Sequence, residues 1–239
     1  TARAARQLAP HLDCISAERI QEELAKLLAA PQPGAYLEPA VLAVVLPELT
    51  PEGLTAAKPV VDACPAGEEN LPVRWAALLG ALGEDDTRRV LKRLRCSNAC
   101  IEETAVLVRE AAGQGVCRSF SEEKASAHPG DIHLRQLLGR YGLCTVERLC
   151  ELCAALHPQN APACALAAQR ARQLEADGVC CRVSQLAVNG RDLMAAGIPA
   201  GPALRRVLEA LLDGVIRAEY PNEKTALLAA AEKMTDEKS

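Results

Sequence analysis

An amphipathic helix is predicted by the stretch Ser16-Ala17-Glu18-Arg19-Ile20-Gln21-Glu22-Glu23-Leu24-Ala25-Lys26-Leu27-Leu28. Ser16 is a residue type that caps helix N-termini, and Glu18 would lie in the first turn, where the helix dipole favours negative charge. Four apolar residues then recur at helical spacing on one face: Ile20, Leu24, Leu27 and Leu28. Pro31-Gln32-Pro33-Gly34 ends the run, so a helix begins at Ser16 and stops before Pro31.

The rest of the chain repeats this pattern of capped apolar runs, and no segment predicts a convincing strand. Candidate caps are Thr50, Asn70, Asn98, Asp131, Thr145 and Asn160, and candidate helix ends are Gly83, Gly113, Gly115, Gly142 and Gly178. We therefore expect an all-α fold of about a dozen helices.

A helical hairpin is predicted in the last quarter of the chain. Asp192 can cap a short helix that Gly197 ends, and Pro202 suits the first position of the long helix that follows. The amide groups of that helix's first turn would face outward beside two arginines, which is a reasonable seat for a phosphate. Glycines at such turns are more often purely structural. The candidate phosphate seat comprises Gly197, Gly201, Arg205 and Arg206.

A second group of cations lies on the helix predicted over residues 86–95. At about 100° per residue, its positive side chains share one side while Val90, Leu91 and Leu94 point away. The cations are Arg88, Arg89, Lys92, Arg93 and Arg95. A buried opposite face would hold this basic stripe rigid, which favours contact with an RNA backbone. A basic face that meets only solvent explains the pattern equally well.

Composition favours a soluble globular protein and restricts how it can bind nucleic acid. Of the 239 residues, 49% are hydrophobic and 24% are charged, and the longest apolar stretch, Ala40 to Leu46, is too short to span a membrane. We expect a cytoplasmic protein with no membrane partner. Only five aromatic residues are present, so stacking of bases on aromatic rings is not expected, and a net charge of −4 argues against nonspecific polyanion binding. Contacts with the phosphates of a duplex remain possible.

Eleven cysteines suggest a disulfide or zinc framework at first sight. Their number is odd, and the chain is not a small secreted domain of the kind that disulfides stabilise. Cys150 and Cys153 form a CxxC, but with Val146, Leu149 and Leu156 they make one apolar helical face. We interpret the cysteines as reduced core residues and expect no metal site. No constellation of catalytic residues is found either.

Two blocks carry a family resemblance. The first is Ser16-Ala17-Glu18-Arg19-Ile20 with the Leu46-Pro47-Glu48-Leu49 segment that follows, and the second is Asn189-Gly190-Arg191-Asp192-Leu193 with Gly197, Gly201 and Asn222. Both resemble the part of class II tRNA nucleotidyltransferases, the CCA-adding enzymes and their bacterial poly(A) polymerase relatives, that follows the catalytic head. The resemblance implies an elongated neck at residues 1–66, a helical body at 67–178 and a tail at 179–239.

The resemblance also implies a function. The parent reaction would transfer CMP and AMP from CTP and ATP to the 3′ end of tRNA, with magnesium bound in the head. Ser16, Glu18 and Arg19 match the neck motif, in which Glu18 and Arg19 would brace the nucleotide pocket. The body and tail would hold the acceptor stem and elbow of tRNA through phosphates, with no role for DNA. The metal-binding carboxylates of the head have no counterpart here, so we expect a fragment that is inactive alone and binds no cofactor itself.

Other interpretations stay open. A bacterial poly(A) polymerase is the nearest, although those relatives commonly end in a basic extension and this chain ends in the mixed segment Glu232-Lys233-Met234-Thr235-Asp236-Glu237-Lys238-Ser239. CC-adding and A-adding relatives are further alternatives. A helical protein-interaction module without an RNA role belongs to another class. RNA binding requires the basic stripe to be exposed and on the same side as the turn at residues 197–206, whereas a packed or opposed stripe would favour the interaction module.

Overall fold

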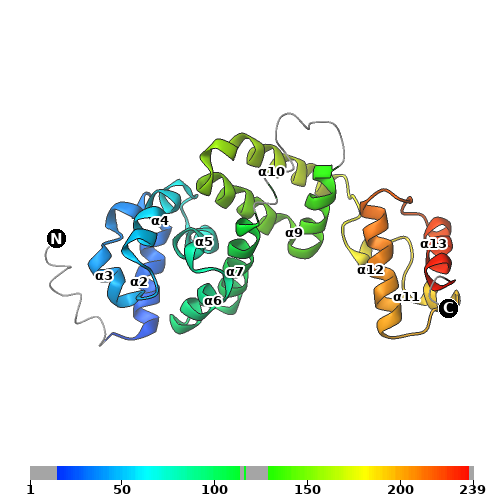
Figure 1. Cartoon of the computed structure of the whole chain (residues 1–239), viewed down its shortest axis with the longest axis horizontal. Helices are drawn as coiled ribbons and strands as arrows, with labels where there is room; N and C mark the ends of the chain where they lie inside the picture. The colour runs from blue at the N-terminus through cyan, green and yellow to red at the C-terminus, as the bar shows by residue number, and fades with distance from the viewer. Residues whose placement is uncertain (1–14, 114–115, 117–128, 237–239) are drawn as a thin grey trace. The chain divides into compact units, whose positions relative to one another are not determined.

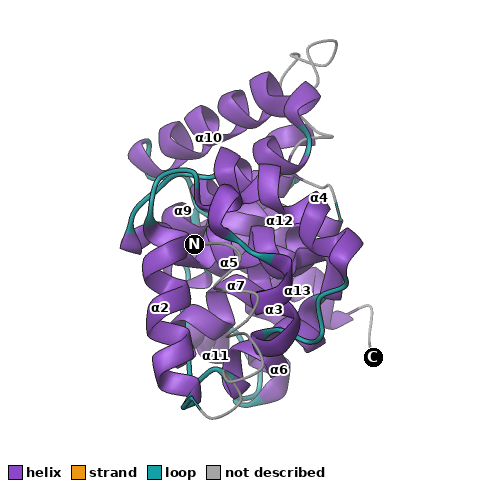
Figure 2. Ribbon diagram, turned by 90° about the vertical axis from the view of Figure 1, so that its left-hand side faces the viewer, coloured by secondary structure: helices purple, strands orange, loops and turns teal. Residues whose placement is uncertain are grey.

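The computed structural model describes residues 15–113, 116 and 129–236, and it consists of helices joined by loops and turns (Figure 1). Figure 2 shows no strand within these ranges, and eleven α-helices lie in them. The predicted all-α fold is therefore confirmed. In the same ranges, no helix has the length and hydropathy needed to cross a membrane. Gly115, Cys14 and Cys117, about which the sequence made predictions, lie outside the described residues.

The chain forms two compact units. The first unit comprises Thr1–Ala125 with Glu147–Ala168, and the second comprises Ser126–Val146 with Gln169–Ser239. The three-part division at residues 66 and 178 stays a prediction.

The helices of the first unit are short and closely spaced in the chain. Between residues 15 and 113 they are α2 (Ala17–Ala29), α3 (Pro39–Val45), α4 (Pro51–Ala63), α5 (Leu71–Leu79), α6 (Glu84–Arg93) and α7 (Asn98–Ala112). Three single-turn 3-10 helices connect them: η2 (Pro33–Tyr36), η3 (Glu68–Asn70) and η4 (Gly80–Leu82).

Side-chain caps set the starts of several of these helices. Thr50 accepts a hydrogen bond from the amide of Gly53 at 3.0 Å, so this predicted cap is confirmed. The predicted cap at Asn98 is wrong by one residue, because Ser97 accepts the bond from the amide of Cys100 at 3.3 Å. Ser97 has the extended backbone that lets a side chain reach back to the first turn, whereas Asn98 is already helical.

Helix α5 forms the centre of the first unit. Its residues from Val73 to Leu79 are all buried, as expected of a helix that is covered on every side. It packs against α4 and α7, and Trp75 is the largest side chain in this core. Burial of one indole and several leucines contributes about 2 to 3 kcal/mol for each side chain.

Arg74 lies inside this core, with only 1% of its surface exposed. Its guanidinium donates to the carbonyls of Leu28 and Ala30 at 2.5 Å each, to that of Pro65 at 2.8 Å and to that of Cys64 at 2.9 Å. These carbonyls lie at or just after the C-terminal ends of α2 and α4. At a helix C-terminus, backbone carbonyls lack helical partners and the helix dipole is negative. Burial lowers the pKa of Arg74 from its ordinary value, yet the four carbonyls satisfy the cation.

The second unit is built around the last three helices of the chain. They are α11 (Gly190–Ala195), α12 (Pro202–Ile216) and α13 (Lys224–Asp236), preceded by the single-turn η7 (Val183–Gln185). Two longer helices, α9 (Pro129–Leu156) and α10 (Ala161–Ala176), contribute residues to both units, with η6 (Pro158–Asn160) between them. The core of the second unit contains Cys180, Leu186, Val188, Leu193, Ile198, Leu211, Val215, Leu227 and Ala231.

Helix α9 is interrupted at Gly142. This residue has φ 79° and ψ 170°, a conformation that side chains with a Cβ rarely adopt. The sequence predicted a helix end at Gly142, and the structure shows a sharp break with helical residues on both sides.

Nine cysteines lie in the described part of the chain, and none of these nine is in a disulfide. Cys150 and Cys153 are both buried, as the apolar face predicted. Burial raises the pKa values of the Cys64 and Cys96 thiols to about 12. The ranges that the structure covers contain no group of three or more His, Cys, Asp or Glu side chains placed to hold a metal ion.

Candidate nucleic-acid interface

The first block of the sequence starts helix α2. Ser16 is its N-cap and accepts a hydrogen bond from the amide of Arg19 at 3.4 Å, as predicted. Glu18 lies in the exposed first turn, and its Oε1 is 3.8 Å from Nε of Arg95. The structure thus brings the predicted neck motif next to the predicted basic stripe, through an ion pair between residues that are 77 positions apart in the chain.

The basic stripe is carried by α6, whose charges follow its dipole. Acidic residues occupy the first turn, and Lys92 and Arg93 occupy the last. Val90 and Leu91 are buried on the opposite face, as predicted. The helix ends at Arg93, however, so the predicted continuation to Arg95 is wrong. Arg95 has φ 62°, and the bond from the amide of Cys96 to the carbonyl of Leu91, 3.0 Å, closes the helix end around it.

Arg88 and Arg93 are held by carboxylates. Arg88 is ion-paired with Glu84 at 3.1 Å and with Glu102 of α7, and these bonds raise its pKa above the ordinary value, Glu102 contributing most. Arg93 binds both oxygens of Glu48, at 3.1 and 2.8 Å, and the carbonyl of Val45 at 3.1 Å. Both arginines therefore connect α6 to neighbouring segments, and a phosphate would have to displace these carboxylates.

Arg89 and Lys92 are the more accessible cations of the stripe. The side chain of Arg89 is 79% exposed, and among the described residues its ion-pair partner is Asp86, one turn earlier on the same helix. Lys92 is exposed and has no ion-pair partner among the residues that the structure describes. Exposed pairs of this kind contribute at most about 1 kcal/mol, so a phosphate can compete for Arg89. Arg89 and Lys92 on α6 and Arg95 just after its end are therefore exposed cations that a phosphate could reach by breaking at most a weak ion pair.

The second block forms the hairpin between α11 and α12. The cap of α11 is Asn189, whose side chain accepts from the amides of Arg191 and Asp192 at 2.9 and 3.3 Å. Asp192 returns the interaction by accepting from the amide of Asn189 at 3.0 Å, so the prediction that Asp192 itself is the cap is wrong. The two residues form a reciprocal capping box, in which the third helical residue supports the cap.

Glycines with positive φ shape the hairpin at both ends. Gly197 has φ 91° and follows α11, where its amide and that of Ile198 bond back to carbonyls of the helix at 3.0 and 3.1 Å. Gly201 has φ 109° and precedes Pro202, the first residue of α12. The predictions that Gly197 ends the short helix and that Pro202 begins the long one are confirmed, and the start of α12 is exposed to solvent.

Arg205 and Arg206 follow in the exposed first turns of α12. Arg205 donates through Nε to Glu209 at 2.8 Å, one turn later, and its side chain is 82% exposed. Nε of Arg206 is 3.3 Å from the carbonyl of Pro202. These contacts are local and exposed, so both guanidinium groups remain accessible to a phosphate beside the first turn.

Two contacts fix this hairpin to the segments around it. Lys224 donates to Asp192 at 2.6 Å, which lowers the pKa of that carboxyl below its ordinary value, with a further contribution from the amide of Asn189. The Asn222 side chain accepts from the amide of Ala187 at 2.8 Å and donates to the carbonyl of Gln185 at 2.9 Å.

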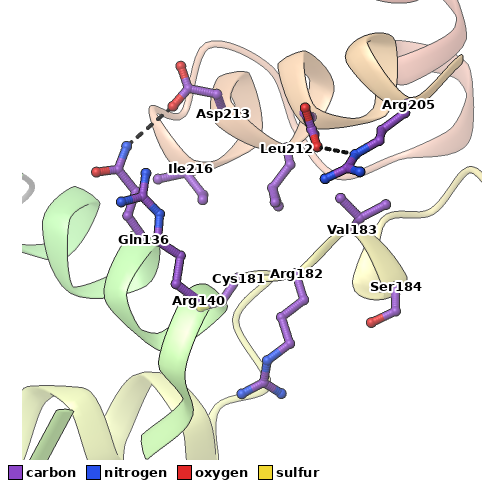
Figure 3. Close-up of a pocket in the computed structure, with 12 residues that line it drawn as sticks. Gln136, Arg140, Cys181, Arg182, Val183, Ser184, Arg205, Leu212, Asp213 and Ile216 are labelled. Carbon is purple, nitrogen blue, oxygen red and sulfur yellow. Dashed lines mark hydrogen bonds and ion pairs between the residues drawn. The ribbon is translucent and has the colours of Figure 1, made fainter. Parts of the chain in front are cut away.

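Arg205 also borders a pocket of about 810 Å³ in the second unit, which the sequence did not predict (Figure 3). Its walls are the segment of α9 around Arg140, the segment from Cys181 to Ser184, and α12. The lining comprises Gln136, Gly139, Arg140, Cys181, Arg182, Val183, Ser184, Arg205, Glu209, Leu212, Asp213 and Ile216. Three separate chain segments build this pocket, so a sequence pattern within any one of them gives little signal of it.

Comparison with known families places matches at both ends of the chain. Residues 136–231 match the family described as tRNA nucleotidyltransferase domain 2, and residues 1–53 match the family described as "Probable RNA and SrmB-binding site of polymerase A". The hairpin, Arg205 and all residues that line the pocket lie within the first match. Ser16, Glu18 and Arg19 lie within the second.

Among curated proteins, CCA-adding enzymes are similar along most of the chain. The enzyme of Geobacillus kaustophilus is 31% identical over 93% of this chain and 52% of its own length, and that of Geobacillus stearothermophilus is 27% identical over 96% and 54%. The enzyme of Levilactobacillus brevis is 53% identical over a shorter segment, 19% of this chain and 11% of its own. No solved structure matches the chain.

The chain spans about half the length of the two Geobacillus enzymes. The family matches at its two ends agree with the two sequence blocks from which the resemblance was inferred. The chain therefore belongs to the family of tRNA nucleotidyltransferases and poly(A) polymerases.

Proposed function

We propose that this chain is the tRNA-binding part of a CCA-adding enzyme of the cytoplasm, and that it holds the acceptor stem and elbow of tRNA while CMP and AMP are added to the 3′ end. The observation that carries the proposal is similarity to CCA-adding enzymes over 93% of the chain, across both compact units. The accessible cations of α6 and of the α11–α12 hairpin supply the means, because phosphate contacts position an RNA duplex without reading its sequence.

Nucleotide transfer in this family would use magnesium with CTP and ATP. The described residues contain no side-chain group fit to hold a metal ion, so we assign no step of the transfer to them. The role proposed for Ser16, Glu18 and Arg19 is support: the capped helix start and the Glu18–Arg95 pair would fix the orientation of the first turn of α2.

A filter-binding salt titration tests the proposal. The chain should bind tRNA and an acceptor–T-arm minihelix with similar affinity, and the logarithm of affinity should fall linearly with the logarithm of salt concentration. A DNA duplex of the same length should bind more weakly, because its helix geometry differs from that of RNA. Absence of tRNA binding by the folded chain at low salt would refute the proposed function.

A poly(A) polymerase is the second candidate, since the match over residues 1–53 carries the name of such an enzyme. The same titration separates the two, because a CCA-adding enzyme should prefer tRNA to an unstructured oligoadenylate. A preference for the oligoadenylate would favour the polymerase.

A further inference from the structure

We propose that the pocket beside Arg140 binds a single nucleotide, with its phosphate on Arg140 and its sugar and base against the apolar wall of α12. This inference rests on the proposed function, because it names one contact through which the second unit would hold RNA. The size of the pocket fits the ligand: about 810 Å³ lies within the range of roughly 300 to 1,000 Å³ that is usual for small-molecule sites.

Among the arginines that line the pocket, Arg140 is the one with no carboxylate partner in the part of the chain that the structure describes. Arg205 is paired with Glu209 at 2.8 Å, and Arg182 lies 3.5 Å from Glu175. Asp213 is occupied by Arg217 at 2.7 Å and by the side-chain amide of Gln136 at 3.3 Å. Arg140 is exposed and has no ion-pair partner in the described part of the chain, and Figure 3 shows its guanidinium group extending toward Gln136.

The remaining lining suits the other parts of a nucleotide. Val183, Leu212 and Ile216 supply apolar surface, and the hydroxyl of Ser184 supplies a hydrogen-bonding group. Because Gln136 donates through its amide nitrogen to Asp213, its carbonyl oxygen is left to accept from a base. No aromatic residue lines this pocket, so the base would contact the aliphatic side chains of Leu212 and Ile216 rather than stack on a ring.

The walls are fixed before any ligand arrives. Arg135 donates to the carbonyl of Cys180 at 2.8 Å and to that of Ile216 at 3.0 Å, and so joins all three segments of the pocket. Gly139 of α9 lies against the carbonyl of Cys181 so closely that a Cβ would collide with it. A preformed site loses less conformational entropy when it binds.

The pocket is continuous with the α11–α12 hairpin, because Arg205 belongs to both. An RNA strand that contacts the start of α12 therefore has the pocket beside it, and an unpaired nucleotide of that strand can enter. A free mononucleotide carries the same phosphate, sugar and base, so the experiment must separate the two sources.

The test compares Arg140→Glu and Ser184→Trp with the wild-type chain in fluorescence anisotropy with labelled tRNA. Arg140→Glu removes the phosphate contact, and Ser184→Trp fills the pocket from an exposed position. Each should raise Kd by about tenfold, the equivalent of one charge-assisted contact. The matched control is Lys233→Glu, an exposed charge reversal outside the pocket. It should not change Kd by more than about twofold. Circular dichroism establishes that each variant is folded, and Ser184→Trp carries the test should Arg140→Glu not fold.

A second arm titrates CMP and AMP by calorimetry. If mononucleotides bind the wild-type chain but not the two variants, the ligand is a free nucleotide; if only tRNA binding responds, it is a nucleotide within RNA. Unchanged tRNA affinity and unchanged calorimetry in folded variants would overturn the inference, even where the wild-type chain binds tRNA. A wild-type chain that does not bind tRNA at all refutes the proposed function instead, and the calorimetric arm still decides whether the pocket takes a nucleotide.

Discussion

Arg93 and Glu48, which lie 45 positions apart, form a two-pronged ion pair with Nε–Oε1 and Nη2–Oε2 distances of 3.1 and 2.8 Å. Arg93 also donates to the carbonyl of Val45, the last residue of α3. The pair therefore ties the end of α6 to the segment after α3. Its cation contributes to the packing of the first unit rather than to a free basic surface.

This geometry divides the basic stripe into two classes of cation. The double variant Arg89→Glu, Lys92→Glu should weaken the binding of all tRNAs alike. Each lost phosphate contact should reduce the slope of log affinity against log salt concentration by about 0.7 to 0.9. Arg93→Met should instead lower the melting temperature and leave that slope unchanged, because it breaks the pair with Glu48. Filter binding and thermal denaturation measure the two effects.

The matched control for the stripe is Lys26→Glu, an exposed charge reversal elsewhere in the first unit. It should change neither affinity nor slope appreciably. Equal losses for Lys26→Glu and for the double variant would mean that net charge, and not the stripe, governs binding.

Arg74→Leu should destabilise the first unit by about 3 kcal/mol, because four buried carbonyls lose their donor and the new side chain cannot replace it. Urea denaturation followed by circular dichroism measures the loss. Arg191→Leu, at an exposed position of α11, should change stability by less than about 0.5 kcal/mol. An Arg74 variant as stable as wild type would show that the carbonyls find other donors.

Thiol reactivity should follow burial. Burial raises the pKa values of Cys64 and Cys96 to about 12, so at pH 8 both are almost entirely protonated and should resist iodoacetamide in the folded chain. Among the nine cysteines that the structure describes, Cys144 is exposed and should be alkylated first. Mass spectrometry of peptides after a timed reaction gives the order, and early modification of Cys64 would contradict its position in the core.

Lowering the pH should remove the contribution of ionised Asp192 to the stability of the folded chain. Its pKa is lowered in the folded chain by the hydrogen bonds from Lys224 and from the amide of Asn189, so its ionised form stabilises folding. That contribution is complete above the ordinary pKa of 3.8 and is lost as pH falls through the lower folded value. Asp192→Asn should therefore be less stable than wild type at neutral pH, and the difference should shrink below about pH 4. Denaturant titrations across this range measure it, and a difference that does not depend on pH would point to the loss of packing alone.

Much of the fold follows from local chemistry that the sequence displays. Ser16, Thr50 and Gly197 act where their residue types predicted, because a cap or a left-handed turn is decided within four residues. The errors at Asn98 and Asp192 are also local. In each case the cap is another polar residue, one or three positions earlier, whose backbone is extended and not yet helical.

The electrostatics of the candidate interface could not be predicted in the same way. Helical periodicity correctly predicted that Val90 and Leu91 are buried. The carboxylates of Glu102 and Glu48 that pair with Arg88 and Arg93, however, lie in other segments, and no local sequence pattern connects them to α6. The pocket beside Arg140 is of the same kind, since its walls meet only in the folded second unit.

The acceptors of Arg74 are all main-chain oxygens, and this has a consequence for how the sequence can vary. A pair of side chains must change in concert to keep an interaction, whereas Leu28, Ala30, Cys64 and Pro65 can each be exchanged for another residue and still present the same carbonyl. The contact that joins α2, α4 and α5 through these carbonyls therefore depends on the side chain of a single residue, Arg74. Related chains should drift freely at the four acceptor positions, within the limits of packing, while position 74 stays an arginine.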